Sequence, residues 1–365
     1  MKLMREFLSL DIGFHNIKLA VGSVFGASQR ITEALVFETP ENAIEDGKIL
    51  APELLAAAIK EQLAKHGIKT KDAVLSINGT AIISREVIMP KVKEREIRSI
   101  IEMESDQYFP VSLDNYAVDF KVIEEITGNG KSQYKVLVVA IPSQMIEKYL
   151  ELANLCGLNL VKIDYAGNSI NKLVNKEYFN KDYFTSKKGQ NNKALDTLAV
   201  VDMGSRTTTV TILSKGILQF SRIIFYGGSS MTNSIADRLN ILYDEAERKK
   251  KSLSKIIDSA DEDSAGKEDV QISNSIKSVA LILIDDMSKY FEFYNSRGTG
   301  NKIDTICLTG GSSEISGLDN YLSNAFSIPV IKLKMPRSIQ YKNRENKAGI
   351  DYKYFSVCLG ALLEK

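Results

Sequence analysis

The chain has 365 residues, of which 44% are hydrophobic and 25% charged, and its formal net charge is +1. This length suits two domains with sizeable cores, and the balanced charge argues against a nucleic-acid-binding protein. Cys156, Cys307 and Cys358 are widely spaced in apolar stretches, so we expect buried thiols in a reducing compartment rather than disulfides. His15 and His66 are too few for a histidine-based metal site.

The sequence contains no stretch that approaches the roughly 20 apolar residues needed to span a bilayer. The first eight residues run into a predicted strand and lack a signal-peptide pattern. Residues 354–365 read as a core helix and not as an amphipathic membrane anchor. We therefore expect a cytoplasmic protein.

The first quarter of the chain alternates strands with one helix. Residues 6–37 alternate apolar and polar side chains in three short runs broken at glycines, which predicts a strand meander. Pro52 is suited to the first turn of a helix, and apolar residues at helical spacing continue to Gly67. Strands are predicted at 73–77 and 82–89.

The next part reads as a small α+β unit. A charged amphipathic helix is predicted over 91–109, and two strands follow it on either side of a hairpin signal at 128–130. Ser143 begins a further helix, and 158–163 is again a strand. We expect these elements to form a unit over 90–163 that is inserted into the first half of the chain.

The second half repeats the order of elements seen in the first. A connecting helix is predicted at 164–174 and a polar loop at 176–196, followed by three strands over 197–225. Residues 252–270 are acidic and poor in apolar residues, so we expect a mobile segment there, before the long helical pattern of 272–297. Strands followed by helices in each half predict a duplicated α/β architecture with a ligand cleft between the halves.

Two matching glycine-bearing turns lie far apart in the chain. One contains Asp11-Ile-Gly13 and the other Asp202-Met-Gly204, each after an apolar run and before small or polar residues. Such a turn exposes backbone N–H groups that bind phosphate oxygens, and its carboxylate suits Mg²⁺, usually through water. A third turn, at 309–313, carries two glycines. Asp-x-Gly alone is a weak signal, because Gly and Asp favour any turn, but its repetition predicts a nucleotide site.

These motifs occur in the order found in the actin-like ATPase superfamily, which includes actin, Hsp70, sugar kinases and FtsA, and the chain resembles this superfamily. More narrowly, residues 89–120, 286–294 and 309–318 resemble the signature of the PilM family of type IV pilus assembly proteins. The resemblance implies a duplicated actin-like (RNase H-like) fold of two domains with an inserted α+β subdomain.

The resemblance and the predicted elements together divide the chain into four parts. The first actin-like domain takes residues 1–89 with 164–196 and the C-terminal helix 352–365, the inserted subdomain takes 90–163, the second actin-like domain takes 197–230 and 300–351, and a helical subdomain of the second domain takes 231–299.

The resemblance also implies a site for ATP and Mg²⁺, in which Asp11 and Asp202 act as metal-binding and catalytic carboxylates. The other implied nucleotide-binding residues are Gly13, Phe14, Asn16, Lys18, Gly204, Ser205, Thr207, Thr208, Glu247, Lys250, Gly310, Gly311 and Ser312. Glu247 would accept hydrogen bonds from the ribose, and Lys250 would pack along the base. A solvated helix face explains Lys250 equally well, and explains Lys249 and Lys251 better.

Both phosphate turns depart from the small hydroxyl residues usual in the superfamily. The first turn continues with Phe14, His15 and Asn16, so that the backbone N–H of Phe14 must serve. Asn16 and Lys18 would replace the missing donors, unless Lys18 faces solvent as most strand lysines do. In the second turn, Arg206 either reaches a γ-phosphate or points out of the cleft.

Hydrolysis requires a polar residue that orients the attacking water. In this superfamily it would come from 164–169, where Asn168 is the available amide and a poor candidate. We therefore expect a protein that binds Mg·ATP with weak or no ATPase activity, so that the nucleotide acts as a clamp between the halves.

PilM-like proteins bind the short cytoplasmic tail of PilN, a single-span membrane protein, in a groove between the first half and the inserted unit. The resemblance thus implies a PilN-like partner that recruits the chain to the inner face of the cell membrane, in a type IV pilus or related type II secretion platform. Other platform or motor proteins and self-association fit the same picture. The expected groove residues, which ordinary core packing would also explain, are Ile82, Ile83, Val87, Ile88, Tyr116 and Val118.

Two other functions remain open at this point. An FtsA-like cell-division filament protein would need a C-terminal amphipathic membrane helix, which 354–365 does not supply. A small-molecule kinase of the same superfold would need a catalytic carboxylate at a substrate pocket, and the sequence offers no convincing candidate. The fold alone excludes neither function.

Overall fold

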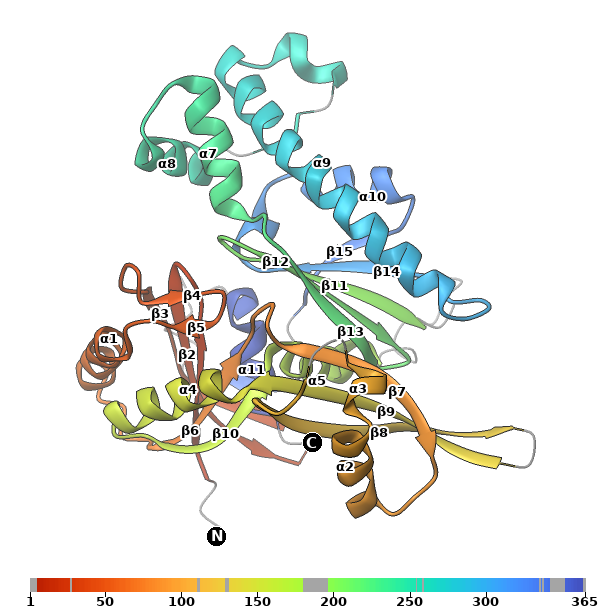
Figure 1. The fold of residues 1–365 in the computed structure, drawn as a ribbon. Coiled ribbons are helices and arrows are strands. Elements are labelled where there is room, and N and C mark those ends of the chain that lie inside the picture. The colour runs from red at the N-terminus through yellow and green to blue at the C-terminus, as the bar shows by residue number, and fades with distance from the viewer. Residues whose placement is uncertain are drawn as a thin grey trace.

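The computed structural model describes residues 5–26, 28–109, 112–128, 131–179, 196–253, 255–257, 259–334, 336, 338–341 and 352–363. The tip of the predicted hairpin at 128–130 and most of the predicted loop at 176–196 fall outside the described residues. The described part contains two larger sheets, each with its own helices, and a smaller third sheet (Figure 1).

The first sheet has six strands in the order β10-β6-β1-β2-β3-β16. They are β1 (Phe7–Ile12), β2 (Asn16–Phe25), β3 (Ser28–Glu38), β6 (Asp72–Ile77), β10 (Asn159–Tyr165) and β16 (Ile339–Tyr341). The predicted meander is confirmed: β1, β2 and β3 are antiparallel neighbours, and β6 joins β1 in parallel. A hairpin of β4 (Ile44–Glu45) and β5 (Lys48–Ile49) follows the meander.

Four helices accompany this sheet. Helix α1 (Pro52–Lys65) packs against α4 (Ser143–Leu155), and α5 (Ala166–Tyr178) packs against α11 (Ser356–Ala361), which follows the short turn η4 (Tyr352–Phe355). Pro52 opens α1 as predicted, because a first-turn proline lacks only an N–H that the helix leaves unbonded. Most residues of β1 and β6 are buried, as expected for strands covered on both faces.

The second sheet repeats the first in its pairing. Its five strands lie in the order β13-β12-β11-β14-β15, and they are β11 (Thr197–Met203), β12 (Thr208–Ser214), β13 (Ile217–Ile224), β14 (Thr305–Thr309) and β15 (Val330–Lys332). Strand β11 pairs antiparallel with β12 and parallel with β14, just as β1 pairs with β2 and β6. The predicted duplication is therefore visible in the sheet topology.

In Figure 1 the helices of the second half lie above its sheet. They are α7 (Gly228–Leu239), α8 (Tyr243–Leu253), α9 (Lys267–Ser296) and α10 (Leu318–Phe326), with the short turns η1 (Ser259–Ser264) and η2 (Gly311–Glu314). Within the described residues, no helix is both long and apolar enough to cross a membrane.

The third sheet has three strands in the order β7-β9-β8. They are β7 (Ile83–Pro90), β8 (Tyr116–Gly128) and β9 (Lys131–Pro142), and the helices α2 (Glu94–Met103) and α3 (Ser105–Tyr108) lie between β7 and β8 in the chain. A separate small core joins α2 to the sheet through Val87, Met89, Ile97, Ile101, Val136 and Val138.

Three strands pair in a different sheet from the one that the predicted domain boundaries implied. Strand β7, expected in the first domain, belongs to the inserted sheet. Strand β10, expected in the inserted unit, pairs with β6 in the first sheet, and β16, expected in the second domain, pairs with β3. Sequence periodicity identifies a strand but not its neighbour, so these assignments could not come from local pattern. The inserted sheet and its helices span 83–142.

The expected mobile segment at 252–270 is anchored where the structure describes it. Ile256 and Ile257 are buried. The backbone N–H of Ile256 donates to the carbonyl of Ser316 over 2.8 Å, and that of Ile257 donates to Ser273 Oγ over 2.9 Å. Helix α9 begins at Lys267, earlier than predicted. The two isoleucines outweigh the acidic surroundings because each contributes buried apolar area.

Candidate functional site

The first and second turns, residues 11–16 and 202–207, are closed by the same hydrogen bond. The N–H of Gly13 donates to the carbonyl of Asn16 over 3.0 Å, and the N–H of Gly204 donates to the carbonyl of Thr207 over 2.9 Å. In either turn a Cβ on the glycine would lie 2.9 Å from that carbonyl oxygen, which is closer than a side chain tolerates. Both predicted strand–turn–strand units are therefore present, and each requires its glycine.

The third turn, residues 309–313, packs against the second. Gly310 has φ = +85°, and a Cβ there would collide with the carboxylate of Asp202 and the carbonyl of Met203. Ser312 Oγ donates to the carbonyl of Gly204 over 3.3 Å. The glycine thus allows the backbone of the third turn to lie directly beside the carboxylate of the second.

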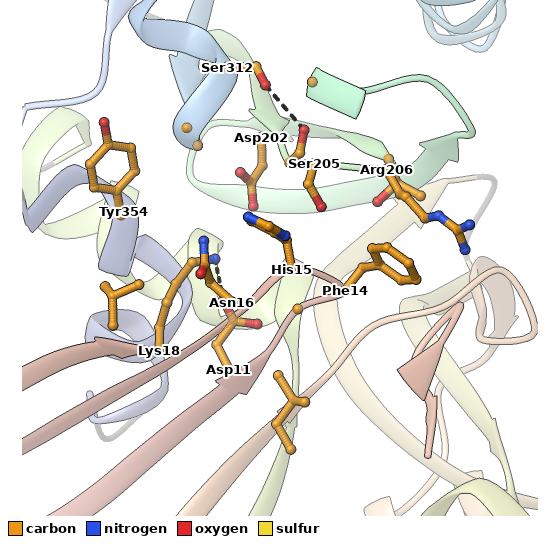
Figure 2. Close-up of a pocket in the computed structure, with 18 of the residues that line it drawn as sticks. Asp11, Phe14, His15, Asn16, Lys18, Asp202, Ser205, Arg206, Ser312 and Tyr354 are labelled. Atoms are coloured by element: carbon orange, nitrogen blue, oxygen red, sulfur yellow. Dashed lines mark hydrogen bonds and ion pairs between the residues drawn. The ribbon is translucent and has the colours of Figure 1, made fainter. Parts of the chain in front are cut away.

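The three turns surround a cavity of about 1220 Å³ between the two large sheets. Figure 2 shows side chains of the first and second turns facing each other across it. Fourteen of the predicted nucleotide-binding residues line the cavity: Asp11, Gly13, Phe14, Asn16, Lys18, Asp202, Gly204, Ser205, Thr207, Glu247, Lys250, Gly310, Gly311 and Ser312.

Thr208 is the exception, and its prediction is corrected by the strand alternation. Its side chain is fully buried, and its Oγ1 donates to the carbonyl of Tyr226 over 2.7 Å. The cavity is lined instead by Thr207 and Thr209. Successive side chains of a strand point to opposite faces, so Thr208 cannot share a face with both neighbours.

Lys18 pairs with Asp11 and also feels the charge of Asp202 in the cleft. Its Nζ lies 3.0 Å from Asp11 Oδ2, as Figure 2 shows, so Lys18 does not face solvent. Burial by itself would lower the pKa of Lys18, but the charges of Asp11 and Asp202 outweigh it and raise the pKa. Desolvation raises the pKa of Asp202, with Lys18 opposing and Asp11 reinforcing this shift.

These groups suit a magnesium ion that is bound together with phosphates. Among the described residues, no group of three or more His, Cys, Asp or Glu side chains could hold a metal, so a cage built from the protein alone does not fit. Mg²⁺ commonly uses one or two carboxylates, retained waters and substrate phosphates. Asp11 and Asp202 supply two carboxylates on opposite sides of the cleft, which fits that arrangement.

Glu247 and Lys250 form a half-buried pair on α8 at the other end of the cavity. Lys250 Nζ lies 2.7 Å from Glu247 Oε2 and donates to the carbonyl of Gly228 and to Thr232 Oγ1, over 2.8 and 2.7 Å. Burial lowers the pKa of Lys250 against the opposing charge of Glu247. Burial would raise the pKa of Glu247, but hydrogen bonds from Lys250 and Thr232 and the lysine charges lower it overall.

The solvated-face interpretation is therefore wrong for Lys250, which ties α8 to the start of α7. Both neighbouring lysines are more exposed than Lys250. Lys251 is 65% exposed, and Lys249 forms a surface ion pair with Glu268 over 2.6 Å. The adenosine segment expected from the resemblance thus lines the cavity through Lys250 and the more exposed Lys251, and Lys249 lies outside the lining.

The connecting segment after β10 does not present Asn168 to the cleft. Asn168 Nδ2 donates to Asp164 Oδ1 over 2.8 Å, and Ser169 Oγ donates to Asp164 Oδ2 over 2.7 Å. Lys172 Nζ lies 2.7 Å from the same carboxylate. Burial would raise the pKa of Asp164, but the charges of Lys172 and Lys162 lower it overall. Within the described segment 164–169, Ala166 lines the cavity, and Asp164 and Asn168 do not.

Several cavity residues were missed by the sequence reasoning. Asn78, just after β6, donates from Nδ2 to Thr209 Oγ1 across the cleft over 3.1 Å, and Ser76 lies abreast of Asp11 in the parallel pair β1–β6. The rule that ligands lie beyond the carboxyl ends of parallel strands could have found Ser76 and Asn78. Tyr354 was also missed, whereas His15 and Arg206, which line the cavity as well, were already named in the two turns.

The expected groove residues do not lie on one surface. Ile82 and Val87 are buried, whereas Ile88 is 52% exposed. Val87 and Ile88 are neighbours on β7 and so face opposite sides of its sheet. Ile83, Tyr116 and Val118 are partly buried and pack against the core of the inserted sheet. Core packing explains Val87, and a groove could not use Val87 and Ile88 together.

Comparison with known proteins identifies the family. The sequence profile described as "Type IV pilus assembly protein PilM" matches residues 9–364. The chain belongs to the PilM family. The PilM resemblance carried by the motifs is therefore confirmed.

Solved structures show the same fold as this PilM-family chain. The PilM–PilN type IV pilus biogenesis complex aligns with a TM-score of 0.77 at 20% identity, covering 99% of this chain and 98% of the other. MreB5 of Spiroplasma citri bound to ADP aligns with a TM-score of 0.54 at 16% identity, covering 98% and 94%. These similarities confirm the predicted actin-like fold.

More distant sequence relatives are cell-division proteins. FtsA of Bacillus subtilis strain 168 is 24% identical over 68% of this chain and 58% of its own length. FtsA of Staphylococcus epidermidis strain RP62A is 22% identical over 98% of this chain and 80% of its own length. The PilM-family chain thus also has detectable sequence similarity to FtsA.

Proposed function

We propose that this PilM-family protein binds Mg·ATP between its two halves and acts as a nucleotide-dependent adaptor in type IV pilus assembly or a related type II secretion platform. The observation that carries the proposal is the pair of identically closed turns that face each other across one cavity, with Lys18 between their carboxylates. A similar fold in MreB5 is bound to ADP, which supports a nucleotide as the ligand.

Different residues would contact different parts of the nucleotide. The N–H groups of the first and second turns that do not close the turns, together with the Lys18 ammonium, would face the phosphates. Asp11 and Asp202 would hold Mg²⁺ through water, and the ion would neutralise phosphate charge. Glu247 would accept hydrogen bonds from the ribose, and the third turn with Lys250 would flank the base.

We expect slow hydrolysis or none. In-line attack needs a group that orients a water near the terminal phosphate. Asn168 donates its amide to Asp164, and Asp164 is saturated by Lys172 and Ser169. The connecting segment therefore has no polar side chain available for that task among 164–169, and the bound nucleotide would act as a clamp. A turnover above about 1 s⁻¹, typical of true enzymes, would contradict this expectation.

We further propose that the partner is the cytoplasmic tail of a PilN-like inner-membrane protein, which would place the chain at the inner face of the cell membrane. A PilM–PilN complex shares the fold over nearly the whole chain, which supports this choice. The groove would lie between the first half and the inserted unit. Tyr116 and Val118 on the edge strand β8 are partly accessible and would line it together, whereas Ile88 lies on the opposite edge strand β7 and faces the other side of the inserted sheet.

An FtsA-like role in filaments is the second candidate, because FtsA proteins are relatives over most of the chain. Self-association that depends on ATP but not on a membrane peptide would favour it. A small-molecule kinase has no specific observation in its favour.

Calorimetric titration with Mg·ATP, with and without a synthetic peptide from the partner's cytoplasmic N-terminus, tests the proposal. We expect ATP binding by the wild-type chain and a loss of at least tenfold in Lys18→Met, because charge-assisted hydrogen bonds contribute about 1.5–3 kcal/mol. Peptide affinity that changes with ATP supports the adaptor. ATP binding without a peptide response favours the filament role, and absence of ATP binding refutes the proposed site.

A further inference from the structure

Arg206 rests on the ring of Phe14, and this contact joins the second turn to the first across the cleft. The Cζ atom of Arg206 lies 3.8 Å from the centre of the Phe14 ring. Arg206 Nη1 lies 3.6 Å from Glu45 Oε1, at the β4–β5 hairpin. Figure 2 shows the two side chains stacked at the edge of the cavity. Both residues stand where the superfamily usually has small ones.

We infer that Arg206, held in place by Phe14, binds the third phosphate of a nucleoside triphosphate and so makes the cleft select triphosphate over diphosphate. The inference rests on the proposed nucleotide binding and deepens it. It gives one role to the departures in both turns, which would otherwise be two unrelated bulky substitutions in a phosphate site.

The stacking leaves the guanidinium ready for a phosphate. An arginine that lies over a ring uses the face of its guanidinium, whereas its N–H donors point outward in the plane. A planar fork of donors matches two phosphate oxygens at once. Phe14 therefore fixes the plane of the guanidinium without consuming its donors, which reduces the loss of side-chain freedom on binding.

Lys18 and Lys250 have shorter ion pairs than Arg206. Lys18 pairs with Asp11 over 3.0 Å, and Lys250 pairs with Glu247 over 2.7 Å. The ion pair of Arg206 with Glu45 is longer, and the two side chains are 51% and 67% exposed. Exposed ion pairs contribute little, so a phosphate can replace Glu45 at small cost.

The contacts along the cleft set Arg206 at the end away from the adenosine segment. Lys250 bonds the carbonyl of Gly228. A Cβ on Gly228 would lie 2.5 Å from Ser312 Oγ and 3.7 Å from the carbonyl oxygen of Gly204. The adenosine segment, the third turn and Gly204 are thus neighbours. The backbone of Arg206 lies near Gly227 beside them, and its side chain extends from there to Phe14 of the first turn. A nucleotide with its base at Lys250 directs its last phosphate toward Arg206.

The competing explanation is a latch. In that case the Phe14–Arg206 contact only holds the halves together, and its loss weakens every nucleotide alike. The two explanations differ in the ratio of ATP affinity to ADP affinity. They also differ at Glu45, which competes with a phosphate for Arg206 in the first explanation and helps to close the cleft in the second.

The test is calorimetric titration of Mg·ATP and Mg·ADP into the full chain at one fixed ionic strength. We expect Arg206→Ala to lower the ratio of ATP to ADP affinity about tenfold, as for a lost hydrogen bond to a charged group. Arg206→Lys keeps the charge without the fork and should recover part of the ratio. Phe14→Leu keeps bulk without the aromatic face and should lower the ratio about threefold, whereas Glu45→Gln should raise it about twofold.

Arg95→Ala is the matched control, because Arg95 is a 78% exposed arginine on α2, outside the residues that line the cavity. It should leave the ratio as in the wild type. Equal weakening of both nucleotides by Arg206→Ala and Glu45→Gln overturns the inference in favour of the latch. A wild-type chain that binds neither nucleotide refutes the proposed function itself, and one that binds both with a ratio insensitive to Arg206 refutes this inference alone.

Discussion

The ends of β10 and β11 each carry an aspartate, and the two carboxylates have opposite environments. Asp164 is 2% exposed and accepts from Asn168, Ser169 and Lys172. Asp202 lines the cleft and shares the Lys18 ammonium that pairs with Asp11. Folding lowers the pKa of Asp164 and raises that of Asp202. A carboxylate with a complete set of partners stabilises the fold, and one with a shared partner is left for a ligand.

The largest effect should come from breaking the Asp164 pair. Lys172 also donates to the carbonyl of Leu363 over 2.8 Å and thereby holds α11 to α5. Lys172→Met leaves the buried carboxylate with only the more distant Lys162 as a cation, at 3.8 Å, so we expect a loss of about 3 kcal/mol in the free energy of unfolding, measured by denaturant titration. The double variant Asp164→Asn with Lys172→Met should recover much of it. A loss below about 1 kcal/mol in the single variant would show that the pair is not a main support.

The pH dependence should have opposite signs at the two aspartates. Folding lowers the pKa of Asp164 below its ordinary value of 3.8, so the advantage of wild type over Asp164→Asn is complete above that value. It is lost as the pH falls through the folded pKa. Folding raises the pKa of Asp202 above 3.8. Wild type therefore loses stability relative to Asp202→Asn as the pH rises from 3.8 through that folded pKa. Each tenfold difference between the folded and unfolded acid dissociation constants corresponds to about 1.4 kcal/mol.

Denaturant titrations of the three proteins between pH 3 and pH 7 check both signs. If the free energies of unfolding of wild type and Asp202→Asn change with pH in parallel across this range, folding does not raise the pKa of Asp202. If the stability difference from wild type changes with pH in the same direction for Asp164→Asn and Asp202→Asn, the two aspartates do not have opposite pKa shifts.

The smallest effect should come from Asn168→Ala. The variant loses one hydrogen bond to Asp164, so we expect about 1 kcal/mol less stability. Its affinity for Mg·ATP should equal that of wild type, because the Asn168 side chain bonds Asp164 and does not line the cavity. Calorimetry and thermal melting separate the two effects. A change in nucleotide affinity without a change in stability would indicate that Asn168 contacts the nucleotide, which contradicts its assignment as a partner of Asp164.

Local pattern was sufficient for the turns and insufficient for what surrounds them. The order Asp-x-Gly after an apolar run predicted both turns, because the glycine is required within the turn itself. The choice between Thr208 and its neighbours depends on where β12 begins, which pattern fixes only to within a few residues. The carboxylates at Asp11 and Asp164 look alike in sequence, and their partners Lys18 and Lys172 are set by tertiary packing.

The same limit applies to the sheets. The strands at 82–89 and 158–163 were predicted from alternation, but β7 and β10 joined other sheets than expected. Partner choice depends on contacts between residues far apart in the chain, which a window of local sequence does not contain. The pattern of elements predicted a duplicated α/β architecture, and the resemblance to the PilM family identified it as actin-like.

The position of α11 has a consequence for the order of folding. Phe355, Cys358 and Leu359 are buried in the core of the first half. Gln29 Nε2 donates to the carbonyl of Leu359 across a separation of 330 residues. On the ribosome, the apolar face that receives α11 stays uncovered until these last residues emerge. The sheet of the second half, whose strands lie within 197–332, can close earlier. The half that is synthesised first is therefore completed last.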